Sequence, residues 1–270
     1  MSSLVSVKSS AHWYFPATGE ACHEVPMTSK GNEGKMRNTT VADARKMGLY
    51  PSVTTIISLL DKPFLVAWKV EQAILSALTI PAIDGESVDD LARRVISDAE
   101  AQVDKARKIG SLLHDAVERY VTLHEFPADP LIAPLMQPFI AWWDENCEQA
   151  FYCETPVVGA GYAGRIDCKA KLKGIGTAII DFKGRKPDKA GKFGTYDEDC
   201  LQLTAYREAD ALTRPRADAC VSILMNNVPD TTPSVHIHVW PQEECDRFLM
   251  AFIGLKNLWQ ILKKYTPPII

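Results

Sequence analysis

The run of residues 161–183, GYAGRIDCKAKLKGIGTAIIDFK, limits the fold of this chain more than any other part of the sequence. Apolar residues alternate with others in AGRIDCKAKL and TAIIDFK, and a glycine-containing turn separates the two runs, which predicts an antiparallel β-hairpin. Side chains alternate between the faces of a strand, so Asp181 and Lys183 leave the same face. The neighbouring strand sets Asp167 beside them. The hairpin therefore predicts that two carboxylates and one ammonium group converge.

This combination of charges indicates a metal site. Adjacent carboxylates repel each other unless a cation lies between them, and Mg²⁺ and Mn²⁺ prefer hard oxygen ligands. Such an ion can accept a phosphate, and a nearby lysine can orient or deprotonate the attacking water. We therefore expect Asp167, Asp181 and Lys183 to form a catalytic site that hydrolyses a phosphodiester with Mg²⁺ or Mn²⁺.

The elements around the hairpin predict a mixed sheet covered by helices. The run FYCETPVV, residues 151–158, is typical of a strand that forms a meander with the hairpin. We expect a helix to begin within residues 51–57, further helices over 87–120, 131–150, 197–211 and 242–264, and strands over 220–225 and 234–240. Gly110 is expected to break or kink the helix over 87–120. The fold class is an α/β or α+β domain with a central mixed sheet flanked by helices.

Length and composition indicate one folded domain. The 270 residues, 46% of them hydrophobic, suffice for one substantial core. Residues 1–50 are rich in glycine, serine, threonine and charge and show little periodicity, so we expect an irregular N-terminal extension lying over the core. Residues 51–270 would then form the domain.

The chain has the character of a cytoplasmic protein. The apolar run around residues 57–68 is interrupted by Asp61, Lys62 and Pro63, and no run reaches the roughly 20 residues of a membrane helix. The start, MSSLVSVKSSAHWYF, shows neither a signal peptide nor the arginine-rich character of mitochondrial targeting. Seven cysteines without a CxxC pair predict reduced thiols and no closed zinc site.

Net charge limits how nucleic acid could bind. At −4 the chain cannot hold a phosphate backbone by bulk positive charge, so any DNA contact must be local. Five cations follow or belong to the proposed active strand and form a candidate contact, although a solvated loop is the simpler interpretation of the run alone. These cations are Lys183, Arg185, Lys186, Lys189 and Lys192. Tyr206, Phe193 and Tyr196 are candidates for stacking on bases beside the run, and core packing is their alternative role.

Other side chains are candidates for the same site. His114 could complete a carboxylate metal site, and Glu118 shares its helix face, although a lone helical histidine is more often structural. Gln202 and Tyr206 lie four residues apart on one helical face and could hold Lys183 or a phosphate, or could form a half-buried polar face. Arg165 could reach a phosphate, or could pair with Glu154 on the opposite strand.

Taken in order, these residues resemble a known family. His114 after Gly110, then Gly164-Arg165-Ile166-Asp167, then Asp181-Phe182-Lys183, then Gln202 and Tyr206, are similar to the motifs of the PD-(D/E)XK nucleases of the RecB-like exonuclease branch. The similarity includes the mitochondrial genome maintenance exonucleases and their phage and bacterial relatives. The segment from Pro51 to Trp68 also resembles their N-terminal part, so the resemblance covers roughly residues 50–210.

The resemblance implies a role for each matching position. His114, Asp167 and Asp181 would hold the divalent metal, together with the backbone carbonyl of Phe182. Lys183 would position or activate the attacking water. Two further sets complete the implied site: DNA-binding or orienting residues, namely Arg165, Lys186, Gln202 and Tyr206, and possible additional acids, namely Glu118 and Glu154. Some relatives hold an iron–sulfur cluster with four cysteines, but only Cys220 and Cys245 lie late in this chain, so we expect no cluster.

The sequence therefore predicts a restriction-endonuclease-like core and a metal-dependent DNA exonuclease. We expect it to act on single-stranded DNA or DNA ends in replication, repair or recombination. Its expected partners are DNA and proteins of those processes, with no membrane, in the cytoplasm of a bacterial or phage-infected cell. A structure-specific endonuclease on the same fold and a non-catalytic nucleic-acid-binding protein are the alternatives. The complete set of Asp167, Asp181 and Lys183 favours an enzyme.

Overall fold

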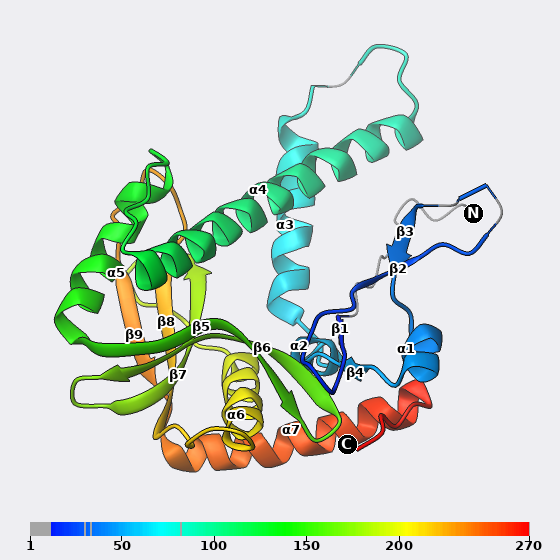
Figure 1. The fold of residues 1–270 in the computed structure, drawn as a ribbon. Helices are drawn as coiled ribbons and strands as arrows, with labels where there is room; N and C mark the ends of the chain where they lie inside the picture. The colour runs from blue at the N-terminus through cyan, green and yellow to red at the C-terminus, as the bar shows by residue number, and fades with distance from the viewer. Residues whose placement is uncertain (1–11, 30, 33, 82, 270) are drawn as a thin grey trace.

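A five-stranded mixed sheet forms the centre of the molecule (Figure 1). This computed structural model describes residues 12–29, 31, 32, 34–81 and 83–269. The strands lie in the order β5-β6-β7-β8-β9, antiparallel except for the parallel pair β7 and β8. They are β5 (Cys147–Gly159), β6 (Tyr162–Leu172), β7 (Gly176–Arg185), β8 (Ala219–Asn226) and β9 (Val235–Val239). The predicted α+β class with a central mixed sheet is confirmed.

Glycine turns and one helical crossover set this strand order. Gly161, with φ +81°, closes the turn between β5 and β6, and Gly174, with φ +72°, lies in the turn to β7. Both conformations are strained for residues with a side chain. The parallel strand β8 requires a crossover, which α6 (Asp197–Ala211) provides after β7. The bounds of α6 are those predicted from the sequence.

Helices cover both faces of the sheet. The helices α4 (Val88–Leu123) and α5 (Ile132–Asn146) pack on one face, in a core that includes Phe139 and Phe182. On the other face α6 lies with α2 (Val53–Ile57) and α7 (Gln242–Lys263), in a second core. Residues of β7 alternate between these cores, because Ile180 and Phe182 belong to the first and Ile179 to the second. Asp181 and Lys183 therefore face the α6 side.

The N-terminal region is built into this second core. It contains β1 (Trp13–Tyr14) paired with β4 (Tyr50–Pro51), β2 (Glu24–Pro26) paired with β3 (Met36–Asn38), and α1 (Val41–Met47). Trp13 is fully buried, and its ring lies edge-on to Trp259 of α7. The segment 1–50 is thus not wholly irregular over its described residues, while residues 1–11, 30 and 33 of that prediction lie outside them.

A helical hairpin projects from the body between α2 and the sheet (Figure 1). It consists of α3 (Pro63–Thr79) and the first half of α4, which contact each other. Ser76 donates a hydrogen bond to Asp98 at 2.7 Å across the hairpin. The sequence predicted a helix start within residues 51–57 but no end for it, and α3 was not predicted.

Two predicted boundaries are wrong. The helix expected over 131–150 ends at Asn146, and β5 begins at Cys147, because the chain there already pairs with the end of β6 at Leu172. The break expected at Gly110 does not occur, because α4 stays helical from Val88 to Leu123. Among the described residues, none of the helices combines the length and apolar character that crossing a bilayer requires.

Candidate active site

The predicted acidic pair and lysine lie together on β6 and β7. Just beyond the paired part of these strands, the backbone N–H of Phe182 donates a hydrogen bond to Asp167 Oδ2 at 2.9 Å. On β7 the Lys183 ammonium donates to Asp181 Oδ1 at 2.8 Å. The hairpin thus brings the two carboxylates and the ammonium group together where β6 and β7 stop pairing.

His114 on α4 joins the same cluster. Its Nε2 lies 3.0 Å from Asp167 Oδ2, and its Nδ1 lies 3.5 Å from Glu154 Oε1 on β5. One ligand atom from each of these three side chains lies within 4.8 Å of the other two. Among the described residues this is the one such group of potential metal ligands. Glu118 lies outside this group. Burial raises the pKa of Glu154 most, the charge of Asp167 adds to the rise, and the charge of Glu118 makes a smaller contribution in the same direction.

Glu154 reaches the cluster through an unusual backbone conformation. Its φ is +46°, in the left-handed region where residues other than glycine are strained. Arg165, on the neighbouring strand, donates to the Glu154 carbonyl at 3.2 Å, and its Nε lies 3.7 Å from the Glu154 carboxylate. The pairing of Arg165 with Glu154 is therefore the interpretation that the structure favours for this arginine.

The protonation of His114 and Asp167 is coupled through their contact. The hydrogen bond to Asp167 raises the pKa of His114 to about 9, despite the opposing effect of burial. Burial raises the pKa of Asp167, but the hydrogen bond from His114 and the charge of Lys183 together hold it below its usual value. The metal-free site therefore holds an imidazolium–carboxylate pair at neutral pH.

Asp181 and Lys183 form a second coupled pair. Burial raises the pKa of Asp181 to about 7, while the Lys183 charge opposes this rise and Asp167 adds to it. Burial lowers the pKa of Lys183, but the charges of Asp181 and Asp167 outweigh it and the net pKa is raised. Lys183 is therefore an ammonium ion at neutral pH.

One oxygen of Asp181 has the character of a metal ligand. The Oδ2 atom is buried and has no hydrogen-bond partner, although the residue is only 1% exposed. A buried carboxylate oxygen without a partner is costly. The donor set of His114, Asp167 and Asp181 consists of imidazole nitrogen and carboxylate oxygens, which suit Mg²⁺ or Mn²⁺. The residues present therefore fit a divalent metal.

Gln202 on α6 joins Asp181 and Lys183 of β7 to the helix. Its Nε2 donates to Asp181 Oδ1 at 2.9 Å, and its Oε1 accepts from Lys183 at 3.5 Å. Of the two interpretations for this glutamine, the structure shows the contact with Lys183. The amide fixes the Asp181 and Lys183 side chains relative to α6.

Tyr206 lies one turn further along α6 and is buried against β6. It is 5% exposed, and a Cβ atom at Gly164 would lie 2.4 Å from its Cε1 atom. Burial raises the pKa of Tyr206 well above its usual value, and the Asp167 charge adds to this rise. The hydroxyl therefore stays protonated, and the ring supports the strand that carries Asp167.

The basic run from Lys183 to Lys192 contains both paired and exposed cations. Arg185 donates to both oxygens of Asp199, at 2.7 and 2.6 Å, and to the Gly194 carbonyl. Lys183 is paired with Asp181. The exposed cations of the run are Lys186, Lys189 and Lys192. Lys186 and Lys189 line a cavity of about 350 Å³ between this loop and the β8–β9 connection.

Two of the three predicted stacking residues are not available to a base. Phe193 is 6% exposed and Tyr206 5%, so both rings pack in the interior, as their alternative role required. Tyr196 is 47% exposed. The prediction of stacking is therefore wrong for Phe193 and Tyr206, because neighbouring side chains cover both rings.

The structure adds two residues that the motifs did not indicate. Thr54 and Lys62 line a cavity of about 210 Å³ that also reaches Lys183 and Gln202. No spacing rule connects them with β7, since α2 and the start of α3 bring them to the site. Their signal in the sequence was only their place within the segment from Pro51 to Trp68.

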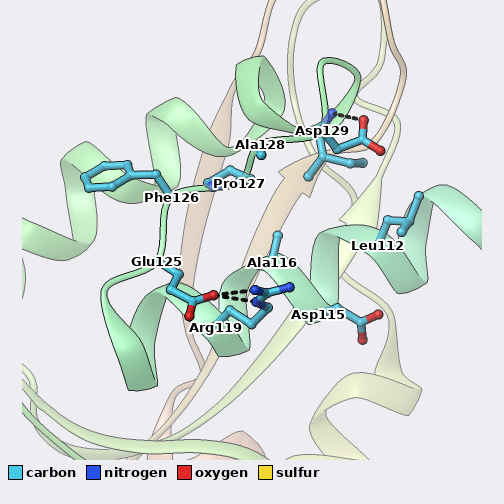
Figure 2. Close-up of a pocket in the computed structure, with 10 residues that line it drawn as sticks. Leu112, Asp115, Ala116, Arg119, Glu125, Phe126, Pro127, Ala128 and Asp129 are labelled. Atoms are coloured by element: carbon cyan, nitrogen blue, oxygen red, sulfur yellow. Dashed lines mark hydrogen bonds and ion pairs between the residues drawn. The ribbon is translucent and has the colours of Figure 1, made fainter.

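A separate cavity lies beside Asp115, the residue that follows His114 on α4. Figure 2 shows Asp115 and Arg119 of α4, with Phe126 of the following loop, around a space of about 290 Å³. Arg119 Nε donates to Glu125 there at 2.8 Å. This cavity shares no lining residue with the one that reaches Lys183.

Sequence comparison adds no relative to this description. No known family model matches the chain, and no curated protein is significantly similar to it. The fold and the geometry of the site are therefore the grounds on which its function can be argued.

Proposed function

We propose that this protein is a metal-dependent DNA exonuclease with a restriction-endonuclease-like core. The observation that carries the proposal is the cluster of His114, Glu154 and Asp167, whose ligand atoms lie within 4.8 Å of one another. Beside it on β7, the Lys183 ammonium lies 2.8 Å from Asp181. This is the set of groups that phosphodiester hydrolysis requires. The resemblance of the motifs to the RecB-like exonuclease branch supports the same conclusion.

In this proposal the metal is held by His114, Asp167, Asp181 and the backbone carbonyl of Phe182. When bound, Mg²⁺ or Mn²⁺ supplies positive charge to the phosphate and lowers the pKa of water. The Glu154 carboxylate lies 3.5 Å from the other ring nitrogen of His114 and would help to orient the imidazole, as partners of metal-bound histidines commonly do. Glu118 contributes negative charge behind Glu154.

Lys183 acts as a cation rather than as a base at neutral pH, because its pKa is raised by Asp181 and Asp167 against the effect of burial. An ammonium group donates hydrogen bonds to a phosphate oxygen and orients the water that attacks it. Gln202 holds this ammonium, and Tyr206 supports β6 beneath it. Lys186 would then contact the DNA backbone beyond the site, whereas Arg165 pairs with Glu154.

The proposed substrate is single-stranded DNA or a DNA end. Exposed cations lie close to the site in Lys186, Lys189 and Lys192, whereas the net charge of −4 disfavours broad capture of duplex DNA. The proposal extends to a role in replication, repair or recombination with proteins of those processes. It also places the protein in the cytoplasm of a bacterial or phage-infected cell, which agrees with an odd number of seven cysteines.

The test compares linear and circular single-stranded DNA, each incubated with Mg²⁺ and with EDTA. We expect the linear strand to be degraded only with the metal, and the circle to persist. Cleavage of the circle at the rate of the linear strand would favour the endonuclease, and binding without cleavage would favour the non-catalytic protein. Asp115→Asn is the matched control for site variants, because Asp115 adjoins His114 in the chain but lines the separate cavity (Figure 2).

A further inference from the structure

The cavity at Lys183 continues into a larger one. The cavity of about 210 Å³ that reaches Lys183 and the neighbouring cavity of about 720 Å³ share Lys62, Tyr196 and Glu198 as lining residues. The larger one extends to Trp68 on α3, and we call it the Trp68 cavity. Its size lies within the range of about 300–1,000 Å³ that is usual for ligand sites.

The Trp68 cavity has aromatic and aliphatic walls, and Trp68 itself is partly buried. Leu65 of α3 is 43% exposed and Tyr196 47%. Leu60 and Pro63, at the start of the helical hairpin, complete this apolar side. Large apolar side chains gathered beside a polar site are a feature of binding surfaces.

The ring of Tyr196 is held in place from one side. The guanidinium carbon of Arg185 lies 4.0 Å from its ring centroid, and Arg185 is itself fixed by Asp199 at 2.6 Å. A ring that is backed by a fixed cation and open on its other side is a preorganised surface for stacking. Ordering it on binding therefore costs little entropy.

Charge excludes a phosphate from this cavity. Its lining includes one cation, Lys62, and the carboxylates of Asp61, Asp197 and Glu198. A phosphate would be repelled by these acids, whereas an uncharged aromatic group would not. Lys62 also lines the narrower cavity, where Lys183 and Arg185 join it against the carboxylates of Glu198 and Asp199, so a backbone phosphate would lie there.

We propose that the Trp68 cavity binds a nucleobase of the DNA strand whose phosphate lies at Lys183, by stacking on Trp68 and Tyr196. This inference rests on the proposed function for the identity of the strand. It assigns recognition of an unstacked base to α3, so a base must leave any duplex before its neighbouring phosphate reaches the site. A duplex end then has to fray before it is cut.

The experiment measures binding without turnover. The Asp181→Asn protein is titrated with a fluorescent single-stranded decanucleotide in Mg²⁺, alone and combined with Trp68→Ala, Trp68→Phe or Tyr196→Ala. Stacking on one aromatic side chain predicts a loss of about 5- to 150-fold in affinity for each alanine variant and recovery with phenylalanine. Phe126→Ala is the matched control, because Phe126 is a 67% exposed aromatic residue in the cavity of Figure 2, and should leave affinity unchanged.

Abasic oligonucleotides make the test specific for a base. One base is removed at each position in turn, and one position should lose affinity by at least the factor that Trp68→Ala loses, because both stacking contacts go with the base. The Trp68→Ala variant should then lose nothing further with that oligonucleotide. Equal affinity of the parent and both alanine variants overturns the inference, as does a loss that is the same for every abasic oligonucleotide.

The outcomes also separate this inference from the proposed function. Base-dependent binding by the Asp181→Asn protein, without any hydrolysis by the wild type, would reject the nuclease and retain the base site. If the wild type hydrolyses DNA and both Trp68→Ala and Tyr196→Ala hydrolyse it at the same rate, the nuclease is retained and the base site is rejected. Thermal unfolding of each variant identifies misfolding, and the abasic series with the Trp68→Phe protein tests the site if Trp68→Ala does not fold.

Discussion

Gly164 of β6 lies directly against the ring of Tyr206 on α6, so close that a Cβ atom at residue 164 would stand 2.4 Å from the Cε1 atom of the ring. The two residues are 42 positions apart and belong to two of the motifs in the sequence. Their contact gives a physical reason for both: the glycine makes room for the ring, and the ring supports the strand three residues before Asp167.

Gly164→Ala should therefore destabilise the protein and lower its activity. Overpacking of this kind costs about 1–3 kcal/mol, because the added methyl group displaces the ring or the strand. In a Tyr206→Ala background the same substitution should cost much less, and chemical unfolding of the four proteins of this cycle measures the coupling. Gly110→Ala is the control, since no atom lies within 4 Å of its Cβ position and the helix should gain up to about 1 kcal/mol. Equal costs of Gly164→Ala in both backgrounds would contradict the prediction.

Asp181→Asn should abolish hydrolysis and leave the fold intact. The amide keeps the shape of the side chain but removes the charge that holds the metal, so the loss of a few kcal/mol corresponds to about 10²–10³-fold in rate. Single-turnover cleavage of linear single-stranded DNA provides the measurement, with Asp115→Asn as the control. A rate within tenfold of the wild type would exclude the proposed role of Asp181.

Lys183→Ala should separate catalysis from metal binding. The ammonium is a donor to water or phosphate and not a metal ligand, so turnover should fall by about 100-fold or more. The affinity for Mn²⁺ should stay within about tenfold, which isothermal titration calorimetry of the variant can determine. Parallel loss of both properties would mean that Lys183 holds the acidic residues in place.

Metal binding should strengthen with pH up to about 9. The pKa of His114 is raised to about 9, mainly by its hydrogen bond to Asp167, and an imidazolium cannot ligate a metal. Below that pH, Mg²⁺ must displace a proton from His114, and below about 7 a second proton from Asp181. An isolated histidine would instead give a plateau above about 6.5. Calorimetric titrations between pH 6 and 9.5 distinguish the two profiles, and His114→Asn should remove the upper part of the dependence.

Asp210 should be essential for stability. It is 1% exposed and accepts from the buried Lys169 at 2.7 Å, besides Tyr152 and Arg214. Asp210→Asn leaves the Lys169 charge buried without a counter-ion, which costs about 3–5 kcal/mol in the free energy of unfolding. Asp218→Asn should cost far less, because Asp218 is exposed and accepts one hydrogen bond from the Thr177 backbone at the start of β7.

Acid should abolish this contribution of Asp210. Burial raises the pKa of Asp210, but the hydrogen bonds from Lys169, Tyr152 and Arg214 together lower it below its ordinary value. The stabilisation is therefore present above the unfolded pKa of about 3.9 and lost as pH falls through the lower folded value. Urea unfolding of wild type and Asp210→Asn at pH 7 and pH 3 should show the difference shrinking at the lower pH.

Residue patterns within single segments predicted the elements that are determined by strand alternation and helix capping. The alternation in TAIIDFK identified β7, and α6 has its predicted bounds because Asp199 accepts from the Tyr196 backbone at its start. The start of β5 could not be predicted, since CEQA shows no alternation and is a strand only through its pairing with β6. Gly110 stays helical because α4 makes contacts on both sides of it.

The site was predictable to a similar extent. Asp167, Asp181 and Lys183 follow from strand periodicity within one hairpin. The approach of His114 to Glu154 depends on how α4 packs across β5 and on the positive φ of Glu154, neither of which a motif encodes. Trp68 lies on α3, which no local pattern predicted, so its place in the cavity next to the one that reaches Lys183 emerges only from the tertiary structure.

The unbroken course of α4 joins the projecting hairpin to the candidate site within one helix. Its 36 residues, at about 1.5 Å each, span about 54 Å, with contacts to α3 in the first part and His114 in the last third. In the proposed function, a strand bound at α3 and a metal bound at His114 would therefore contact the same helix.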